Sequence, residues 1–148
     1  MEYKYDRKVG RNYKVETRLR EYTALLKEKE LKSTPQRVAM LRILEEKGHA
    51  DIDHIYNEIK KDFVSISLAT VYKNINTMLE AGLIQEIKVP QKKSKYEITK
   101  HKHSHFVCQK CGEVYDIEHP KKLDIELPEG FEPKEASVMV SGICKECR

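Results

Sequence analysis

The stretch Ser67-Leu-Ala-Thr-Val-Tyr-Lys-Asn-Ile-Asn-Thr-Met-Leu-Glu-Ala-Gly-Leu-Ile-Gln-Glu-Ile-Lys-Val89 changes its hydrophobic period part of the way along. Up to Gly82 the apolar residues recur at helical spacing, and Ser67 stands where a helix N-cap is expected. After Gly82, Leu83–Val89 is a strand candidate, which Pro90-Gln-Lys-Lys joins to a second candidate, Ser94–Thr99. A helix leading into a basic-tipped hairpin is typical of a winged helix-turn-helix, whose last helix lies in the DNA major groove. The expected inner face of this helix comprises Leu68, Val71, Ile75, Met78 and Leu79.

Three further helices are expected before this stretch. Apolar spacing and cap residues predict them over about residues 15–31, 35–48 and 51–63. Together with the hairpin they make residues 1–99 a winged-helix domain, of which residues 1–14 form a basic extension. The overall fold class is therefore expected to be α+β.

Charge is unevenly distributed along the chain. Residues 1–20 carry seven Lys or Arg against three acidic residues, whereas residues 101–148 carry seven against nine. A basic front suggests contact with a polyanion, although an ordinary solvated surface explains the charge equally well. The basic extension is either a DNA-tracking arm or a disordered tail.

The outer face of the helix after Ser67 offers groups suited to DNA. Hydroxyl and ammonium groups bind phosphates, and Asn74 presents a donor and an acceptor that fit a base edge. Tyr72 either stacks on the DNA backbone or belongs to the core. Many small helical domains have such faces without binding DNA, so this pattern alone leaves DNA binding open. The candidate contacts are Ser67, Thr70, Tyr72, Lys73 and Asn74, with Lys92, Lys93 and Lys95 at the hairpin tip for flanking phosphates.

All four cysteines fall in two C-x-x-C pairs, Cys108/Cys111 and Cys144/Cys147, with 32 residues between the pairs. Two such pairs supply the complete tetrahedral shell of a structural zinc site. Disulfides and a redox C-x-x-C are the competing interpretations, and the expected cytoplasmic location disfavours the first. Zinc should contribute folding energy here, because this part of the chain has little apolar residue content.

Histidines alternate in His101-Lys-His103-Ser-His105, just before the first cysteine pair. Residues two apart on a strand share a face, so His103 and His105 can approach one ion together. Asp116 lies on a neighbouring strand candidate and could add an oxygen ligand. Glu97 lies at the exit of the hairpin and His49 between two helices, although a lone histidine such as His49 is more often an ordinary surface residue. Imidazole and carboxylate donors suit Fe(II), Mn(II) or Zn(II). The strand candidates here are residues 105–108, 113–117 and 136–143.

These motifs, taken in order, resemble the ferric uptake regulator (Fur) family of metal-dependent repressors. The matching segments are Thr34–Arg37, Ser67–Asn74, His101–Gly112 and Ser141–Cys147. The resemblance implies a winged helix followed by a small α/β dimerisation domain, residues 100–148, with a four-cysteine zinc site. It also implies a homodimer that binds double-stranded operator DNA, with Arg37 among the DNA contacts, and a regulatory ion held between the domains. By matching positions, the ligands of that ion are His49, Glu97, His103, His105 and Asp116.

The branch within the family is decided by few residues. Asp116 matches the peroxide-sensing branch, in which bound Fe(II) promotes oxidation of a histidine ligand, here His49 or His103. Glu97 departs from that branch, whose known members have aspartate at this position. The alternative is therefore an iron- or other metal-responsive repressor of metal uptake genes. Proline-broken residues after Asp116 replace a longer helix of relatives, and residues 136–143 lack the histidine of an additional metal site.

Other function classes are less well supported by the residues. No apolar run reaches the roughly 18 residues of a membrane helix, and no signal-peptide pattern opens the chain, so a cytoplasmic location is expected. A hydrolytic metalloenzyme would need an open coordination position and a general base, and no H-E-x-x-H motif supplies them, so we expect no enzyme. A zinc-ribbon module that binds another protein and never DNA also stays possible.

Overall fold

The computed structural model describes residues 11–99, 103–118, 124–134 and 136–148. The chain divides into two compact units, Met1–Ile87 with Lys95–Thr99, and Lys88–Ser94 with Lys100–Arg148. The connecting segment of the expected hairpin thus belongs to the second unit. Residues 1–10 of the expected basic extension lie outside the described residues.

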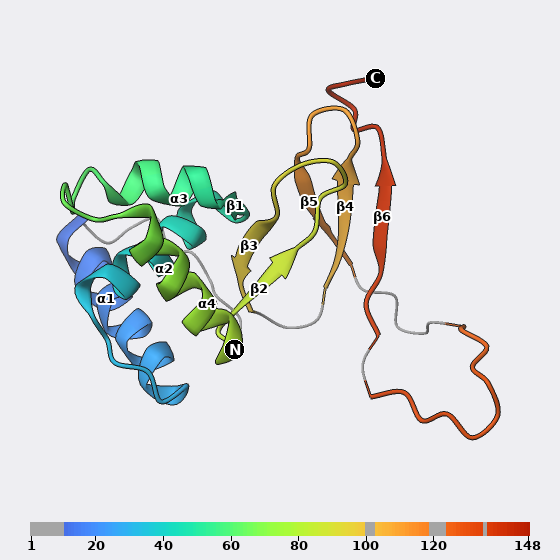
Figure 1. Ribbon diagram of the computed structural model, residues 1–148, viewed down its shortest axis with the longest axis horizontal. Coiled ribbons are helices and arrows are strands. Elements are labelled where there is room, and N and C mark those ends of the chain that lie inside the picture. Colours follow the sequence, from blue (N-terminus) through green and yellow to red (C-terminus); the bar gives the residue numbers. More distant parts are fainter. Residues whose placement is uncertain (1–10, 100–102, 119–123, 135) are drawn as a thin grey trace. The chain divides into compact units, whose positions relative to one another are not determined.

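Four helices build most of the first unit: α1 (Arg11–Glu28), α2 (Pro35–Lys47), α3 (Ile52–Ile59) and α4 (Leu68–Glu80) (Figure 1). Side chains cap three of them, because Thr34, Asp51 and Ser67 each accept a backbone N–H from the residue three positions later. Such caps satisfy donors that the first turn of a helix leaves without a partner. The four helices predicted from the sequence are therefore present, α1 beginning four residues earlier than expected and α3 ending four residues earlier.

The first unit also contains a small antiparallel sheet in the order β1-β3-β2. Strand β2 (Ile84–Ile87) follows α4 directly and pairs with β3 (Lys95–Ile98), forming the expected hairpin. Strand β1 (Ala50–Asp51) lies between α2 and α3 and pairs with the other edge of β3. The sequence did not predict β1, because two residues are too few to show alternation. Its pairing places Ala50, directly after His49, opposite Tyr96 of β3.

One hydrophobic core joins the helices and the sheet of this unit. It contains the fully buried side chains of Leu26, Met40, Leu44, Ile55 and Ile75, among others. Of the inner face expected for α4, Val71, Ile75 and Met78 are buried and Leu79 is partly buried. Leu68 differs, because it stands in the first turn of α4 and remains 41% exposed.

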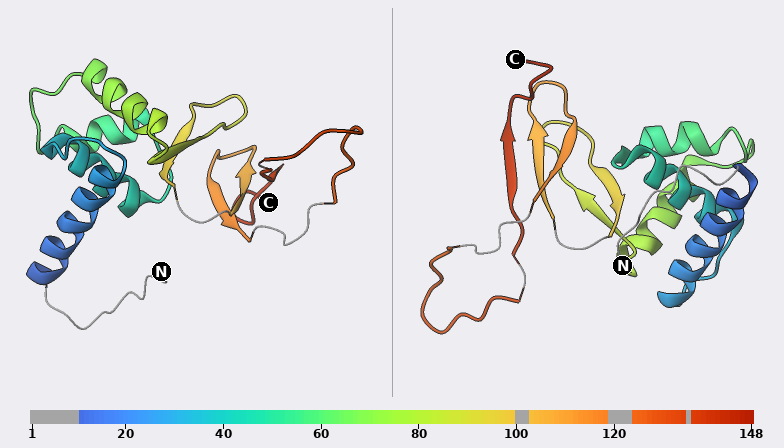
Figure 2. Two further views of the ribbon diagram at one scale, coloured as in Figure 1. Left: turned by 90° about the horizontal axis from the view of Figure 1, so that it is seen from below. Right: turned by 180° about the vertical axis from the view of Figure 1, so that it is seen from behind.

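The second unit has a three-stranded sheet in the order β5-β4-β6 (Figure 2). Strand β4 (Ser104–Cys108) lies in the centre, antiparallel to β5 (Val114–Ile117) and parallel to β6 (Met139–Gly142). All three predicted strands are present, although β6 is shorter than the predicted 136–143. Between β5 and β6, the described residues 124–134 contain no helix or strand.

Among the described residues, no helix is both long and apolar enough to cross a membrane.

Candidate metal centres and nucleic-acid interface

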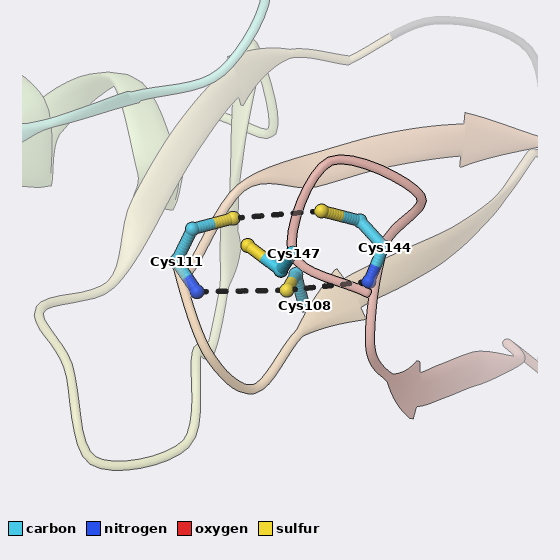
Figure 3. Close-up of side chains that lie close together, drawn as sticks. All are labelled: Cys108, Cys111, Cys144 and Cys147. Atoms are coloured by element: carbon cyan, nitrogen blue, oxygen red, sulfur yellow. Dashed lines mark hydrogen bonds between the residues drawn. The ribbon is translucent and has the colours of Figure 1, made fainter.

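The four cysteines of the second unit converge on one point (Figure 3). Their Sγ atoms all lie within 4.8 Å of one another, and those of Cys111 and Cys144 are 3.9 Å apart. Tetrahedral zinc, with Zn–S bonds of about 2.3 Å, requires sulfur atoms roughly 3.8 Å apart. A disulfide requires about 2.05 Å, and all four cysteines are free thiols. The cluster therefore suits structural zinc and contains no disulfide.

Backbone geometry prepares Cys108 as a zinc ligand. Cys108 ends β4, and the chain then turns through Gly112, whose φ of +76° suits a residue without a side chain. The backbone N–H groups of Cys111 and Cys144 donate to Sγ of Cys108 over 3.5 and 3.4 Å. These two donors lower the pKa of Cys108 to about 5, so the thiolate that binds metal is favoured at neutral pH.

Tyr115 is a neighbour of the cysteine cluster that the sequence did not single out. Its hydroxyl hydrogen-bonds to Cys144, and this bond is the largest cause that raises the pKa of Tyr115 to about 12. Tyr115 lies on β5 and pairs with Phe106 of β4. The position of Tyr115 near the cysteines depends on the register of the two strands, which a single sequence does not reveal.

In the first unit, the structure brings His49 and Glu97 together. Nε2 of His49 lies 2.9 Å from Oε2 of Glu97, whose side chain is only 3% exposed. The approach follows from the sheet, because β1 begins one residue after His49 and pairs with β3, which carries Glu97. Gly48 ends α2 with φ +82° and so turns the chain toward His49.

The second carboxylate oxygen of Glu97 also has a defined partner. Gln85 lies directly opposite Glu97 in the β2–β3 pair, and its side-chain amide donates to Oε1. Sequence analysis did not identify Gln85, because a glutamine in a strand gives no signal of its own.

In the second unit, His103, His105 and Asp116 gather at the start of β4. Nε2 of His103 and of His105 lie 3.3 and 3.5 Å from Oδ1 of Asp116. The two imidazole rings are 4.6 Å apart, and His105 pairs with Asp116 across the strands. The expected alternation is present, since both histidines face the same carboxylate. Such imidazole and carboxylate groups, here and at His49 and Glu97, suit Fe(II) or Mn(II).

The outer face of α4 carries the residues expected to meet DNA. Ser67, Tyr72 and Lys73 are exposed, and Tyr72 at 41% exposure lies outside the core. The hydroxyl of Ser67 caps α4 by accepting the N–H of Thr70 over 3.1 Å. A hollow of about 380 Å³ adjoins this helix start, lined by Gln36, Phe63, Val64, Ser65, Ile66, Ser67 and Thr70.

Two other expected DNA contacts bind each other. Nε of Arg37 donates to Oδ1 of Asn74 over 3.1 Å, joining α2 to α4, and Nδ2 of Asn74 donates to the carbonyl of Thr70. The Arg37 guanidinium also donates to the carbonyl of Lys32. The oxygen and the nitrogen of the Asn74 side-chain amide are thus both engaged within the protein.

The lysines expected at the hairpin tip have different surroundings. Within the second unit, the side chain of Lys92 lies against Gly112 and donates to the carbonyl of Lys110 over 3.5 Å. A Cβ atom at Gly112 would lie 2.5 Å from Cδ of Lys92. Lys92 therefore lies beside the first cysteine turn, although it remains exposed like Lys93, and Lys95 is half-buried.

Comparison with known proteins gives a consistent result. The sequence pattern of the Ferric uptake regulator family matches residues 28–141. The peroxide-responsive repressor PerR of Staphylococcus aureus is 31% identical over 139 residues, which cover 90% of this chain and 94% of that protein.

Solved structures agree with the sequence match. The peroxide stress regulator of Campylobacter jejuni superposes with a TM-score of 0.65 at 39% identity, covering 84% of this chain and 97% of that one. The ferric uptake regulator of Francisella tularensis, solved with iron, has a TM-score of 0.67 at 27% identity, covering 79% and 94%. The chain therefore belongs to the ferric uptake regulator family of metal-responsive transcription regulators.

Proposed function

We propose that this protein is a metal-dependent, DNA-binding transcriptional repressor that senses peroxide. The observation that carries the proposal is the pair of prepared ligand groups, His49 with Glu97 in one unit and His103 and His105 with Asp116 in the other. The similarity to peroxide-responsive repressors supports the same conclusion. Four thiolates from Cys108, Cys111, Cys144 and Cys147 hold the structural zinc.

In this proposal, all five His, Glu and Asp side chains bind one regulatory Fe(II) or Mn(II) ion. An ion that takes ligands from both units fixes the angle between them. In a homodimer, that angle sets the separation of the two α4 helices against successive major grooves. Metal therefore shifts the population toward the DNA-competent arrangement, provided it binds that arrangement more tightly.

The residues proposed to support operator binding include two kinds. Tyr72 and Lys73 project from α4 and reach DNA directly, with Lys73 on a phosphate. Arg37 and Asn74 support DNA binding indirectly, because the hydrogen bond between them holds α4 against α2. The full proposed set is Arg37, Ser67, Thr70, Tyr72, Lys73 and Asn74.

Peroxide sensing is the finer part of the proposal. Bound Fe(II) supplies the redox chemistry that activates hydrogen peroxide. Overall, one peroxide oxygen is inserted into a C–H bond of the imidazole of His49 or His103, and the other leaves as water. The oxidised ring is a poorer ligand, so metal affinity falls and DNA is released. Mn(II) is expected to repress without this chemistry.

The test compares operator release by the Fe(II)- and Mn(II)-loaded proteins. Double-stranded DNA selected from a random library by the Mn(II)-loaded protein serves as the operator. After peroxide, the Fe(II) form should release DNA and gain the mass of one oxygen atom on a peptide containing His49 or His103. The Mn(II) form should remain bound and unmodified. Equal insensitivity of both forms would reject peroxide sensing.

A second candidate, an iron-responsive repressor, is favoured by one specific residue. Glu97 reaches farther than the aspartate of known peroxide sensors and so alters the geometry at the ion. For this function, DNA binding follows the Fe(II) concentration, and peroxide leaves both histidines unmodified. The experiment above separates the two candidates through the mass of the histidine peptides.

A further inference from the structure

Glu97 is a buried carboxylate with both oxygen atoms engaged. It lies on β3, the central strand of its sheet, and its side chain is 3% exposed. Oε1 accepts from the amide of Gln85, and Oε2 lies 2.9 Å from Nε2 of His49. A buried charge at this depth is costly unless hydrogen bonds satisfy it. The two oxygen atoms therefore have different partners, Gln85 on β2 and His49 in the turn between α2 and β1.

The chemistry of Gln85 fits one particular task. An amide N–H satisfies a carboxylate oxygen and leaves the full negative charge in place, whereas Lys or Arg would neutralise it. Gln85 and Glu97 are direct partners in the β2–β3 register, so their side chains share a face and the pairing is fixed by the sheet. The plane of the carboxylate is thereby set, with Oε2 on the side of His49.

We propose that Gln85 is a positioning residue that makes Glu97 a one-oxygen ligand of the regulatory ion. By holding Oε1, Gln85 presents only Oε2 to the metal and prevents the longer glutamate side chain from chelating through both oxygens. Coordination number then stays lower by one than a freely rotating glutamate would allow. This inference rests on the proposed function, because it assumes that Glu97 binds the ion.

The central test is a double-mutant cycle on the full-length, zinc-loaded protein. Gln85→Met removes the donor with little change in size. It should lower Mn(II) affinity about tenfold or more, the usual effect of removing a group that orients a metal ligand. It should also change the visible absorption of Co(II) bound at the same site, because those bands depend on the number and arrangement of ligand atoms. In a Glu97→Ala background, Gln85→Met should have no further effect on either quantity.

A matched control isolates the site effect from general destabilisation. Gln36→Met makes the same substitution at another half-buried glutamine of the first unit, on α2. It should leave Mn(II) affinity and the Co(II) spectrum unchanged. Thermal unfolding of the zinc-loaded variants without Mn(II) shows whether each protein is folded.

Each outcome decides a different question. If Glu97→Ala itself leaves Mn(II) affinity unchanged, Glu97 is not a ligand, and the proposed regulatory site fails together with this inference. If Glu97→Ala weakens Mn(II) binding, but Gln85→Met has the Mn(II) affinity and Co(II) spectrum of the unmodified protein, only the role of Gln85 is wrong. If Gln85→Met lowers Mn(II) affinity equally with Glu97 present and in the Glu97→Ala background, Gln85 has a merely structural role. That result would also overturn the inference.

Discussion

The hydrogen bond between Arg37 and Asn74 joins α2 to α4, the helix proposed to lie in the DNA major groove. Replacing either residue by alanine removes this hydrogen bond from the other, half-buried residue. The expected loss in the free energy of unfolding is about 1–3 kcal/mol. We predict that Arg37→Ala and Asn74→Ala each lower affinity for all DNA sequences alike. Their effects on the free energy of unfolding should be non-additive, with a coupling of about 0.5–3 kcal/mol measured by chemical denaturation.

A base-reading role for Asn74 makes a different prediction. In that case Asn74→Ala would relax the sequence preference at one position, whereas Arg37→Ala would not. Asn76→Ala, the same substitution at an exposed residue of α4, is the control and should leave stability nearly unchanged. Selection of bound sequences from a random DNA library distinguishes the two roles.

Single residues were predictable from the sequence where a motif marks them. The C-x-x-C pairs and the alternating histidines identified side chains that the structure brings together within their unit. His49 and Glu97 were found through the family resemblance, because neither lies in a motif. Gln85 and Tyr115 were missed, since their importance depends on cross-strand register, which is set by tertiary pairing.

At the scale of elements, the end of α2 is tied to the position of His49. Gly48 ends the helix with φ +82° and ψ −62°, and its N–H donates to the carbonyl of Leu44. A residue with a side chain costs about 1–3 kcal/mol in such a conformation. A Cβ at Gly48 would meet no atom within 4 Å, so the cost is one of backbone conformation alone. Gly48→Ala should therefore lower stability by that amount and weaken Mn(II) binding by displacing His49.

Gly130 offers a matched control in the second unit. Its φ is also +82°, and a Cβ there would likewise meet nothing within 4 Å. Gly130→Ala should leave Mn(II) affinity unchanged in a calorimetric titration. If Gly48→Ala destabilises the protein but binds Mn(II) normally, the glycine serves only to end α2.

Elements were predictable where capping residues and periodicity agree. Ser67 and Gly82 located the ends of α4 to within a few residues, because caps act locally. Strand β1 was not predictable, since its two residues acquire their conformation from pairing with β3. Leu68 was assigned to the inner face by its spacing, yet it stands in the first turn of α4 and remains 41% exposed.

For the whole molecule, the sequence predicted a two-part organisation from the change in composition near residue 100. It did not predict that the hairpin connection Lys88–Ser94 groups with the second unit. That grouping depends on packing such as that of Lys92 against Gly112, which residue type alone does not signal. Dimerisation and the placement of one unit against the other depend on contacts between folded parts, which local patterns do not specify.

The two units differ in what stabilises them, so zinc removal should affect their stability differently. The continuous core of Leu26, Met40, Leu44, Ile55 and Ile75 lies in the first unit. Among the described residues of the second unit, the buried apolar side chains are few, and two of them are zinc-site cysteines: Val89, Val107, Cys108, Val114 and Cys144. Zinc binding contributes about 10–16 kcal/mol in small zinc domains, so it should dominate the stability here.

We therefore predict that a strong chelator unfolds the second unit and leaves the first folded. Limited proteolysis should cleave the second unit rapidly, while the helical far-UV signal of α1–α4 persists, and a dimer should dissociate in gel filtration. Cys144→Ser should reproduce the effect, whereas Lys145→Ser, at a highly exposed neighbour, should not. Because the proposed regulatory site would draw three of its ligands from the second unit, the chelated protein should also lose Mn(II) binding until zinc is restored. A chelated protein that resists protease and keeps its size would show that the four thiolates do not hold this unit together.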